Sequence, residues 1–288
     1  MPAENGRPCP ACAQAITRSP CAKICTVDPQ VPVCTGCGRT LDEIAEWRDL
    51  GMDERTTVMR RVRRKERLDR DGFVLVPGVL SAAECERLRS LIEPAAVGKP
   101  GSRTLLREPW CRELAHRLAE RSELGGLLAA GVVPWQATVF DKSIETNWLV
   151  PFHRDLSVPV ARRVDHPALR GWSEKEGLWF VQPPTDDLRR MTAVRVHLDP
   201  SGEQDGALRV VPGSHHVPDP TTDRLAEPDA GDAAAAVVVA ARTGDVLALS
   251  PLLLHASSKR VGEGRRRVLH LLYGPRIASF GLAPPPTA

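Results

Sequence analysis

The C-terminal two-thirds of the sequence is a succession of short apolar runs separated by glycine, proline and aspartate. This pattern restricts the possible folds more than any other feature of the chain. The runs are WQATVF, FHRDLSV, TAVRVHL, ALRVV, AAVVVAA, DVLALS and RRVLHLLY. Many short strands with turn signals between them are typical of a sandwich or barrel rather than of βαβ repeats.

Helices are expected mainly before these runs. Thr40 with Glu43, and Ser81 with Glu84, have the spacing of a capping box, in which each residue's side chain bonds the other residue's backbone N–H. Apolar residues follow both pairs at helical spacing. We expect a further helix over residues 108–129.

Composition and charge exclude several classes of protein. The 288 residues are 42% hydrophobic and 26% charged, and a formal net charge of +3 is too small to indicate binding to nucleic acid or membrane. The basic run RRVRRKER at residues 60–67 contains no aromatic residue, so we interpret it as a solvated helical linker rather than a base-stacking surface. No signal peptide or membrane span is apparent, and we expect a cytoplasmic protein.

Cysteine is concentrated at the N-terminus. Six of the eight cysteines form three closely spaced pairs: Cys9 and Cys12, Cys21 and Cys25, Cys34 and Cys37. In a reducing compartment such clusters are more often metal ligands than disulfides. A stretch this poor in large apolar residues cannot fold alone, so a bound metal would supply the missing free energy. Cys85 and Cys111 are expected to be small buried hydrophobic residues.

The stretch PFHRDLSVPV at residues 151–160 carries a histidine and a carboxylate two positions apart. On a strand, His153 and Asp155 share one face while Arg154 points to the other. They make up two-thirds of the two-histidine, one-carboxylate site that holds non-heme Fe(II). An isolated H-x-D motif is more often structural, so the metal hypothesis depends on a third ligand.

His255 has the best context for that ligand, because it ends the apolar run GDVLALSPLLLH, where a buried strand would reach a cavity. Ser257 shares its face by the period of two. The two glycines of KRVGEG predict a turn that folds RRRVLHLLY back onto the His255 strand as a hairpin, bringing Arg266 near the metal. His255 is preferred over His116, His166, His197, His215, His216 and His270.

A guanidinium and a hydroxyl beside an open iron site suit a dicarboxylate co-substrate, which the metal would chelate at its 2-oxo acid end. Periodicity alone does not choose between Arg266 and Arg267, which point to opposite faces.

Five stretches of the chain carry a family resemblance: DGFVLVPGVLSAAE, FDKSIETNWLVPFHRD, DGALRVVPGSHH, GDVLALSPLLLHASS and RRRVLHLLYG. Through them, roughly residues 68–280 resemble the phytanoyl-CoA dioxygenase family of Fe(II)- and 2-oxoglutarate-dependent oxygenases. The resemblance implies an α+β fold, a cupin-like double-stranded β-helix (jelly roll) with flanking helices.

The resemblance also implies roles for individual residues. It implies three iron ligands, His153, Asp155 and His255. It implies that Ser257 and Arg266 anchor a carboxylate of 2-oxoglutarate. Lys142 matches a lysine ahead of the iron motif, either a co-substrate contact or a support. Arg195 falls where family members often have an aromatic pocket residue, so whether it contacts co-substrate or substrate is open.

The implied reaction uses O2 and 2-oxoglutarate to hydroxylate an unactivated C–H bond of a small-molecule substrate. The substrate itself is not readable from the sequence. Four residues are candidates to line its entrance, although tryptophan is usually core packing: Asn147, Trp148, Trp172 and Trp179.

The N-terminal segments SPCAKIC, DP and CTGCGRTLDEIAEW, within residues 19–66, resemble a small four-cysteine bacterial domain of unknown function that is predicted to be an iron–sulfur protein. The resemblance implies one ligand set, Cys21, Cys25, Cys34 and Cys37. Cys9 and Cys12 could instead join Cys34 and Cys37 in a zinc ribbon, so the choice of four from six is open. Zinc is favoured over a cluster because it needs no assembly machinery.

We therefore expect a cysteine-rich metal-binding domain with a helical tail at residues 1–66 and an oxygenase domain at residues 67–288. The N-terminal domain could dock a protein partner or carrier, or sense redox state. One alternative is an inactive oxygenase-like scaffold that acts as a metal-dependent binding or regulatory module. Another is a dioxygenase that uses substrate electrons without 2-oxoglutarate, against which Arg266 and Ser257 weigh.

Overall fold

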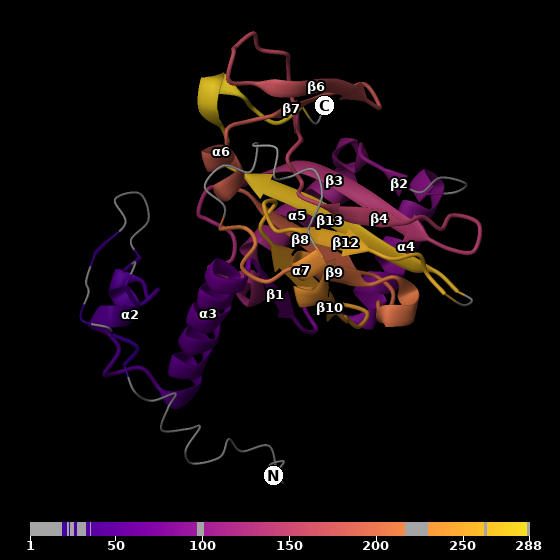
Figure 1. The fold of residues 1–288 in the computed structure, drawn as a ribbon. Coiled ribbons are helices and arrows are strands. Elements are labelled where there is room, and N and C mark those ends of the chain that lie inside the picture. Colours follow the sequence, from indigo (N-terminus) through magenta and orange to yellow (C-terminus); the bar gives the residue numbers. More distant parts are fainter. Residues whose placement is uncertain are drawn as a thin grey trace. The chain divides into compact units, whose positions relative to one another are not determined.

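The computed structural model divides the chain into two compact units, Met1–Arg67 and Leu68–Ala288 (Figure 1). The structure describes residues 19–21, 23, 26–27, 33–34, 36–96, 101–216, 230–261 and 264–286. Within these residues, every helix is too short or too polar to pass through a bilayer.

The first unit contains the short helix α2 (Leu41–Ala45) and most of α3 (Met52–Asp71). α2 begins at the predicted capping box: the Glu43 N–H donates to Thr40 Oγ1 at 3.1 Å, and the Thr40 N–H donates to Glu43 Oε2 at 2.9 Å. The basic run lies on α3, as predicted. A small core holds the unit together, formed by Trp47, Val58, Met59 and Val62.

The second unit is rich in short strands. The strands are β1 (Phe73–Val76), β2 (Gly101–Ser102), β3 (Val133–Lys142), β4 (Val150–His153), β5 (Val158–Val160), β6 (Arg170–Lys175), β7 (Leu178–Gln182), β8 (Thr192–His197), β9 (Leu208–Val210), β10 (Val237–Val239), β11 (Val246–Leu249), β12 (His255–Ser257) and β13 (Arg266–Gly274). The helices are α4 (Ala82–Ala96), α5 (Pro109–Glu120), α6 (Thr185–Arg189) and α7 (Ala230–Ala235), with 3-10 turns η1 (Leu105–Arg107), η2 (Ser122–Leu124), η3 (Glu203–Asp205) and η5 (Ser279–Gly281).

These strands form three sheets. The largest has the order β1-β11-β8-β13-β3-β2, the second β10-β9-β12-β4, and the third β5-β7-β6. All of the strand pairs are antiparallel. The chain crosses repeatedly between the two larger sheets, for example from β3 to β4 and from β11 to β12. This is the double-stranded β-helix with flanking helices that the sequence predicted.

Alternation along β8 shows how the layers are arranged. Val194 and Val196 belong to the core that the largest sheet shares with α4 and α5 (Figure 1). Arg195 points the other way, into a cavity between the sheets. α4 begins at the second predicted capping box, in which the Glu84 N–H donates to Ser81 Oγ at 3.2 Å. The helices therefore cover one face of the largest sheet and leave its other face to build a site.

Two expectations about this unit are wrong in detail. The helix expected over residues 108–129 ends at Glu120 in α5, because Arg121 is extended and the chain continues through η2 to Gly125 and Gly126. The expected hairpin of the His255 and Arg266 strands does not form. β12 pairs with β4 and β9, whereas β13 pairs with β3 and β8. β13 is buried on both faces, which suits the middle of the largest sheet rather than a two-stranded hairpin.

Candidate metal centre

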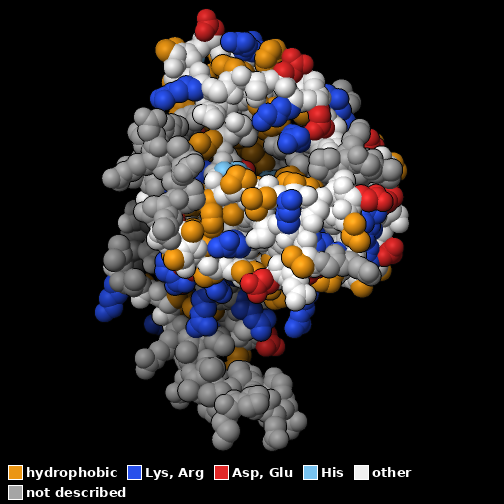
Figure 2. Space-filling model, turned by 45° about the vertical axis from the view of Figure 1, so that its right-hand side comes forward, with side chains coloured by type: hydrophobic (Ala, Val, Ile, Leu, Met, Phe, Trp, Pro, Cys, Tyr) orange, Lys and Arg blue, Asp and Glu red, His pale blue; other side chains and the backbone are white. Residues whose placement is uncertain are grey.

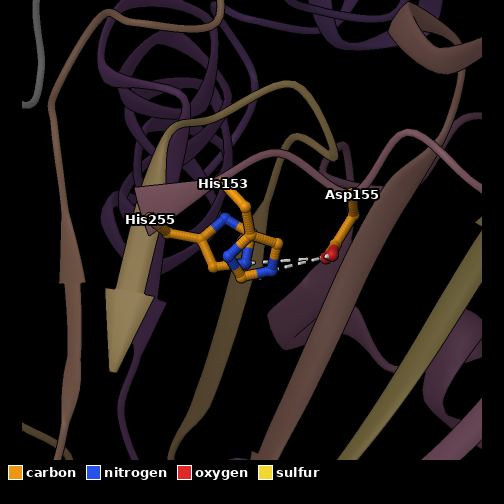
Figure 3. A group of neighbouring side chains, drawn as sticks. All are labelled: His153, Asp155 and His255. Atoms are coloured by element: carbon orange, nitrogen blue, oxygen red, sulfur yellow. Dashed lines mark ion pairs between the residues drawn. The ribbon is translucent and has the colours of Figure 1, made fainter. Parts of the chain in front are cut away.

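Two histidines and an aspartate converge at one edge of the four-stranded sheet (Figure 3). His153 ends β4, His255 begins β12, and the two are cross-strand partners. Asp155 Oδ1 lies 3.5 Å from His153 Nε2, and Asp155 Oδ2 lies 3.7 Å from His255 Nε2. One ligand atom of each residue lies within 4.8 Å of the others, and in the described part of the chain no other His, Cys, Asp and Glu side chains form such a group.

Backbone oxygens fix the orientation of both imidazoles. His153 Nδ1 lies 2.9 Å from the Pro151 carbonyl oxygen, and His255 Nδ1 lies 2.8 Å from that of Leu253. A carbonyl oxygen can only accept, so both Nδ1 atoms donate a proton to the backbone, which leaves both Nε2 atoms, on the side of Asp155, as the atoms able to bind a metal. Metal-binding histidines are held in this way by a hydrogen bond at the second ring nitrogen. The donor set therefore fits a divalent metal ion.

The turn between β11 and β12 holds Asp155 in place as well. The Pro251 carbonyl oxygen accepts the Asp155 N–H at 2.9 Å. The Leu252 carbonyl oxygen accepts Arg154 Nε at 2.8 Å, which turns the arginine away from the centre. The next carbonyl oxygen along the chain is the one that fixes the His255 ring. Three consecutive carbonyl oxygens thus position both ligand-bearing segments.

The strand expected to carry both His153 and Asp155 is shorter than predicted. β4 ends at His153, and the next strand, β5, begins only at Val158. The two side chains share a side because the turn described above binds Asp155 and Arg154, and not because of strand alternation.

The three side chains are strongly coupled. Burial alone would raise the pKa of Asp155, but the neighbouring His255 and His153 hold it well below its usual range. Burial lowers the pKa of His255 to about 4. For His153 burial also acts against the charged form, but the hydrogen bond to Asp155 outweighs it and the pKa is raised. At neutral pH the carboxylate is therefore ionised and ready to bind a cation.

A cavity of about 480 Å³ opens beside His153, Asp155 and His255, here called the triad. It is lined by both larger sheets and by the hairpin of β6 and β7. Figure 2 shows the hollow, with pale blue histidine surface inside it and lysine and arginine side chains around its rim. The inward-facing residues of β3 and β13 form its floor, among them Thr138, Phe140, Arg266 and His270.

The end of the cavity near Arg266 is basic and buried. Lys142 Nζ donates to Ser257 Oγ at 2.7 Å and to the Ser258 carbonyl oxygen at 2.6 Å. Ser257 Oγ and Arg266 both donate to the Gly206 carbonyl oxygen, and Arg266 Nε has no partner. Burial lowers the pKa of Lys142 to about 7 and that of Arg266 to about 9; the charges of Arg266 and Arg195 add to the first effect, and that of Arg195 adds to the second. Neither cation forms an ion pair with a residue in the described part of the chain.

Residues 68–268 match the family described as Phytanoyl-CoA dioxygenase (PhyH). The chain belongs to the phytanoyl-CoA dioxygenase family. It is therefore a 2-oxoglutarate-dependent oxygenase, the enzyme class that the sequence predicted. Residues 19–66 match a second family, described as Protein of unknown function (DUF1289), which agrees with the resemblance of the N-terminal segment. No curated protein sequence matches the chain significantly.

Solved structures of similar fold include HygX from Streptomyces hygroscopicus with nickel and 2-oxoglutarate bound, at 21% identity and a TM-score of 0.51, covering 76% of this chain and 86% of HygX. The non-heme alpha ketoglutarate dependent carbocyclase SnoK from nogalamycin biosynthesis is 16% identical with a TM-score of 0.55, covering 77% of this chain and 86% of SnoK. AviO1 from Streptomyces viridochromogenes Tue57 is 24% identical with a TM-score of 0.51, and the match covers 78% of this chain and 98% of AviO1. At these identities the likeness shows a shared fold.

Arg195 departs from the aromatic residue that the phytanoyl-CoA dioxygenase resemblance leads one to expect. It lies in the cavity floor beside His270, with its Nη1 atom 3.3 Å from His270 Nδ1. The sequence names His270 only among the possible metal ligands and does not predict its place in the cavity floor. His270 and Arg266 are an even number of positions apart on β13 and therefore share one face of the strand. His197, two residues beyond Arg195 on β8, is also buried, and neither of its ring nitrogens has a partner.

The candidate entrance residues are placed differently from one another. Trp148 lines the cavity, with Lys142 Nζ 5.2 Å from its ring centroid. Asn147 instead ties two loops together through the backbone of Arg260. Trp172 and Trp179 pack on the apolar core, as tryptophan usually does, and do not line the cavity. His116 is exposed and His166 stacks on Phe280, away from the cavity.

The cysteines of the N-terminal unit are only partly described. Cys34 and Cys37 are buried, and Cys21 is exposed. The Gly38 N–H donates to the Cys34 carbonyl oxygen at 2.7 Å, closing a tight turn at the CTGCG sequence. Backbone N–H groups, including those of Cys37 and Gly36, help to lower the pKa of Cys34 although burial opposes them. Cys9, Cys12 and Cys25 lie outside the described residues. Cys85 and Cys111 are fully buried in the core, as expected.

Proposed function

We propose that this oxygenase binds Fe(II) through His153, Asp155 and His255, binds 2-oxoglutarate in the adjoining cavity, and hydroxylates an unactivated C–H bond of a small molecule. The observation that carries the proposal is one cavity that holds a two-histidine, one-carboxylate group and buried cations that form no ion pair with a described residue. Fe(II), when bound, supplies oxygen activation coupled to the oxidative decarboxylation of 2-oxoglutarate to succinate and CO2.

The protein's part is to bind and orient the co-substrate. Arg266 is suited to pair with the far carboxylate through its guanidinium, and the Ser257 hydroxyl beside it would turn from the Gly206 carbonyl oxygen to donate to that carboxylate. Lys142 already holds Ser257 Oγ and the Ser258 carbonyl oxygen, so it both supports the anchor and adds a positive charge. An arriving carboxylate would satisfy these buried cations, which gives the free energy of binding a clear source.

The cavity walls supply the second requirement, which is exclusion of water. Phe140 and Phe180 give the polar cavity two apolar walls, and the β6–β7 hairpin is tied down where Glu176 accepts the Arg103 N–H at 2.9 Å. A small-molecule substrate is supported by the cavity's size. One structure of the same fold, that of HygX, holds hygromycin B together with nickel and 2-oxoglutarate.

The test of this function is anaerobic addition of Fe(II) and then 2-oxoglutarate to the purified full chain. We expect a metal-to-ligand charge-transfer band in the visible spectrum that requires both additions. A chain that binds Fe(II) but gives no band with saturating 2-oxoglutarate would favour the binding-module alternative.

For the N-terminal unit we propose a four-thiolate metal site with Cys21, Cys25, Cys34 and Cys37 as ligands and zinc as the metal, next to which a protein partner or carrier docks. The tight turn at Cys34 and the donors that lower its pKa support thiolate chemistry there. Elemental analysis of the full chain, compared with a Cys34→Ser, Cys37→Ser variant, tests it. One zinc lost in the variant is the expected result, and iron with acid-labile sulfide would assign a cluster instead.

A further inference from the structure

Arg195 is a buried cation that the proposed iron and far-carboxylate sites do not use. Its side chain lines the cavity, yet the residue is only 5% exposed, and its Nε has no hydrogen-bond partner. It makes no ion pair with any described residue. Its neighbours are neutral rings: Nη1 lies 3.3 Å from His270 Nδ1, and Cζ lies 5.3 Å from the Phe140 ring centroid.

A buried guanidinium without an anion is costly, so such a group normally faces a charged ligand. Burial lowers the pKa of Arg195 only to about 10, so it remains protonated at neutral pH. Arg195 is therefore an anion-binding group that is already assembled in the cavity floor.

The position of Arg195 along the floor identifies which anion it faces. On β13, His270 is the cross-strand partner of Arg195, while Arg266 is the cross-strand partner of Lys142. The two cationic positions are therefore separated by four residues of strand, or roughly 13 Å. Arg195 contacts His270, the floor residue whose pKa is influenced by Asp155, His255 and His153, so it lies at the end near the triad, although its charge also reaches Lys142 and Arg266.

A 2-oxo dicarboxylic acid has the matching distribution of charge, with one carboxylate at each end of its chain. When its 2-oxo acid end chelates a metal, one oxygen of the 1-carboxylate is used and the other is free to accept a hydrogen bond. We propose that Arg195, braced by His270, binds this 1-carboxylate, so that each carboxylate of 2-oxoglutarate has its own arginine. The proposal rests on the proposed function and names a second co-substrate anchor.

The test compares two ligands that differ only at the far end, 2-oxoglutarate and 2-oxopentanoate, which has a methyl group there. Their affinities for the Ni(II)-loaded full chain are measured by isothermal titration calorimetry, which needs no turnover. We expect Arg195→Gln to weaken both ligands in parallel, by roughly 10- to 100-fold, because both carry the 1-carboxylate. Arg266→Gln should weaken 2-oxoglutarate alone and leave 2-oxopentanoate unchanged.

Two outcomes would overturn the proposal. Unchanged affinities in Arg195→Gln would mean that Arg195 faces something other than the co-substrate. Loss limited to 2-oxoglutarate would mean that it serves the far carboxylate together with Arg266. If the unsubstituted protein binds neither ligand, the proposed function itself fails, and this result is distinct from the other two.

Thermal melting and Ni(II) affinity, measured on each variant, separate loss of the anchor from loss of the fold. Should Arg195→Gln not fold, Arg195→Lys decides the same question, since it keeps the charge but loses the planar pair of donors. A parallel fall in both affinities supports the proposal, and any other pattern contradicts it. Arg163→Gln is the control, because Arg163 stacks over Trp172 at 5.5 Å and does not line the cavity.

Discussion

At the triad, one carboxylate lies between two imidazoles whose protons are fixed by backbone oxygens, whereas at the opposite side of the cavity Lys142 and Arg266 have only neutral hydrogen-bond partners. The first region is arranged before any ligand arrives. The second carries buried positive charge that forms no ion pair with a described residue and that an incoming anion would balance. Metal binding and co-substrate binding should therefore be separable by substitution, although both sites open into one cavity.

The largest effect is expected at the triad. His255→Ala removes one of three ligands, and even the loss of an outer partner of a metal ligand costs about 10- to 100-fold in affinity. We expect Fe(II) affinity to fall by more than about 100-fold, measured as iron retained after anaerobic dialysis. His116→Ala, an exposed histidine on α5, is the control. Full iron occupancy in His255→Ala would reassign the third ligand.

The next largest effect is expected at Arg266, in the basic end of the cavity. Arg266→Ala should weaken 2-oxoglutarate binding by roughly 10- to 100-fold while Fe(II) binding is largely retained, because it removes only a charge-assisted partner of the far carboxylate. The charge-transfer band titrated with 2-oxoglutarate measures this affinity. Arg267→Ala is the matched control, since Arg267 points out of the cavity and pairs with Asp199 at 2.7 Å. Equal losses in the two variants would contradict the assigned role.

A pH dependence of 2-oxoglutarate binding should come from the basic end of the cavity. The pKa of Lys142 is about 7 in the empty cavity, through burial and the charges of Arg266 and Arg195. A carboxylate that pairs with its ammonium form must recruit a proton above pH 7, so the dissociation constant of 2-oxoglutarate should rise there by up to about tenfold per pH unit. Calorimetry in buffers of different ionisation enthalpy measures the proton uptake. Lys142→Met should abolish it.

The same shift affects the free energy of unfolding of the ligand-free protein, with the opposite slope. The folded-state pKa of about 7 lies below the ordinary value of 10.5, so between these pH values the unfolded chain holds a proton that the folded chain has released. Stability should therefore rise with pH across this window, and Lys142→Met should flatten the rise. Denaturant titrations at several pH values check it, and a slope that persists in the variant would assign the effect to another group.

The smallest effect is expected at Ser257. Ser257→Ala removes one neutral hydroxyl from the carboxylate anchor and leaves Lys142 with the Ser258 carbonyl oxygen as its partner. A neutral hydrogen bond contributes about 0.5–1.5 kcal/mol, so 2-oxoglutarate affinity should fall by only about 2- to 15-fold. The charge-transfer titration measures this as well. A loss as large as that of Arg266→Ala would mean that the serine positions the arginine rather than the ligand.

Local sequence rules predicted the parts of the fold that depend on neighbouring residues. The capping boxes at Thr40 and Ser81 require only two side chains three positions apart, and both are present. The short apolar runs likewise predicted strands in a sandwich or barrel, and the family resemblance implied a jelly roll. Strand partners could not be predicted in the same way. β13 is buried and pairs with β3 and β8, both of which lie far from it in the sequence.

The candidate site could likewise be predicted only in part: its metal-binding residues could be proposed from local sequence patterns, but not the contacts that depend on strand pairing. The spacing of His153 and Asp155 and the apolar run before His255 predicted that these three residues lie together, and the structure brings them within reach of one ion. The pairing of Arg195 with His270 could not be found from either residue alone. It depends on the register between β8 and β13, which is set by the whole sheet.

The turn between β11 and β12 has a consequence for how the enzyme tolerates change. The atoms that hold Asp155, Arg154 and His255 are main-chain oxygens of three successive residues, and the side chains of two of these residues, Leu252 and Leu253, are buried in the core and fix the turn in place. Adding or deleting a single residue in this turn would therefore displace all three hydrogen bonds at once. The geometry of the proposed metal site would depend on the number of residues in this turn as much as on the three ligand side chains.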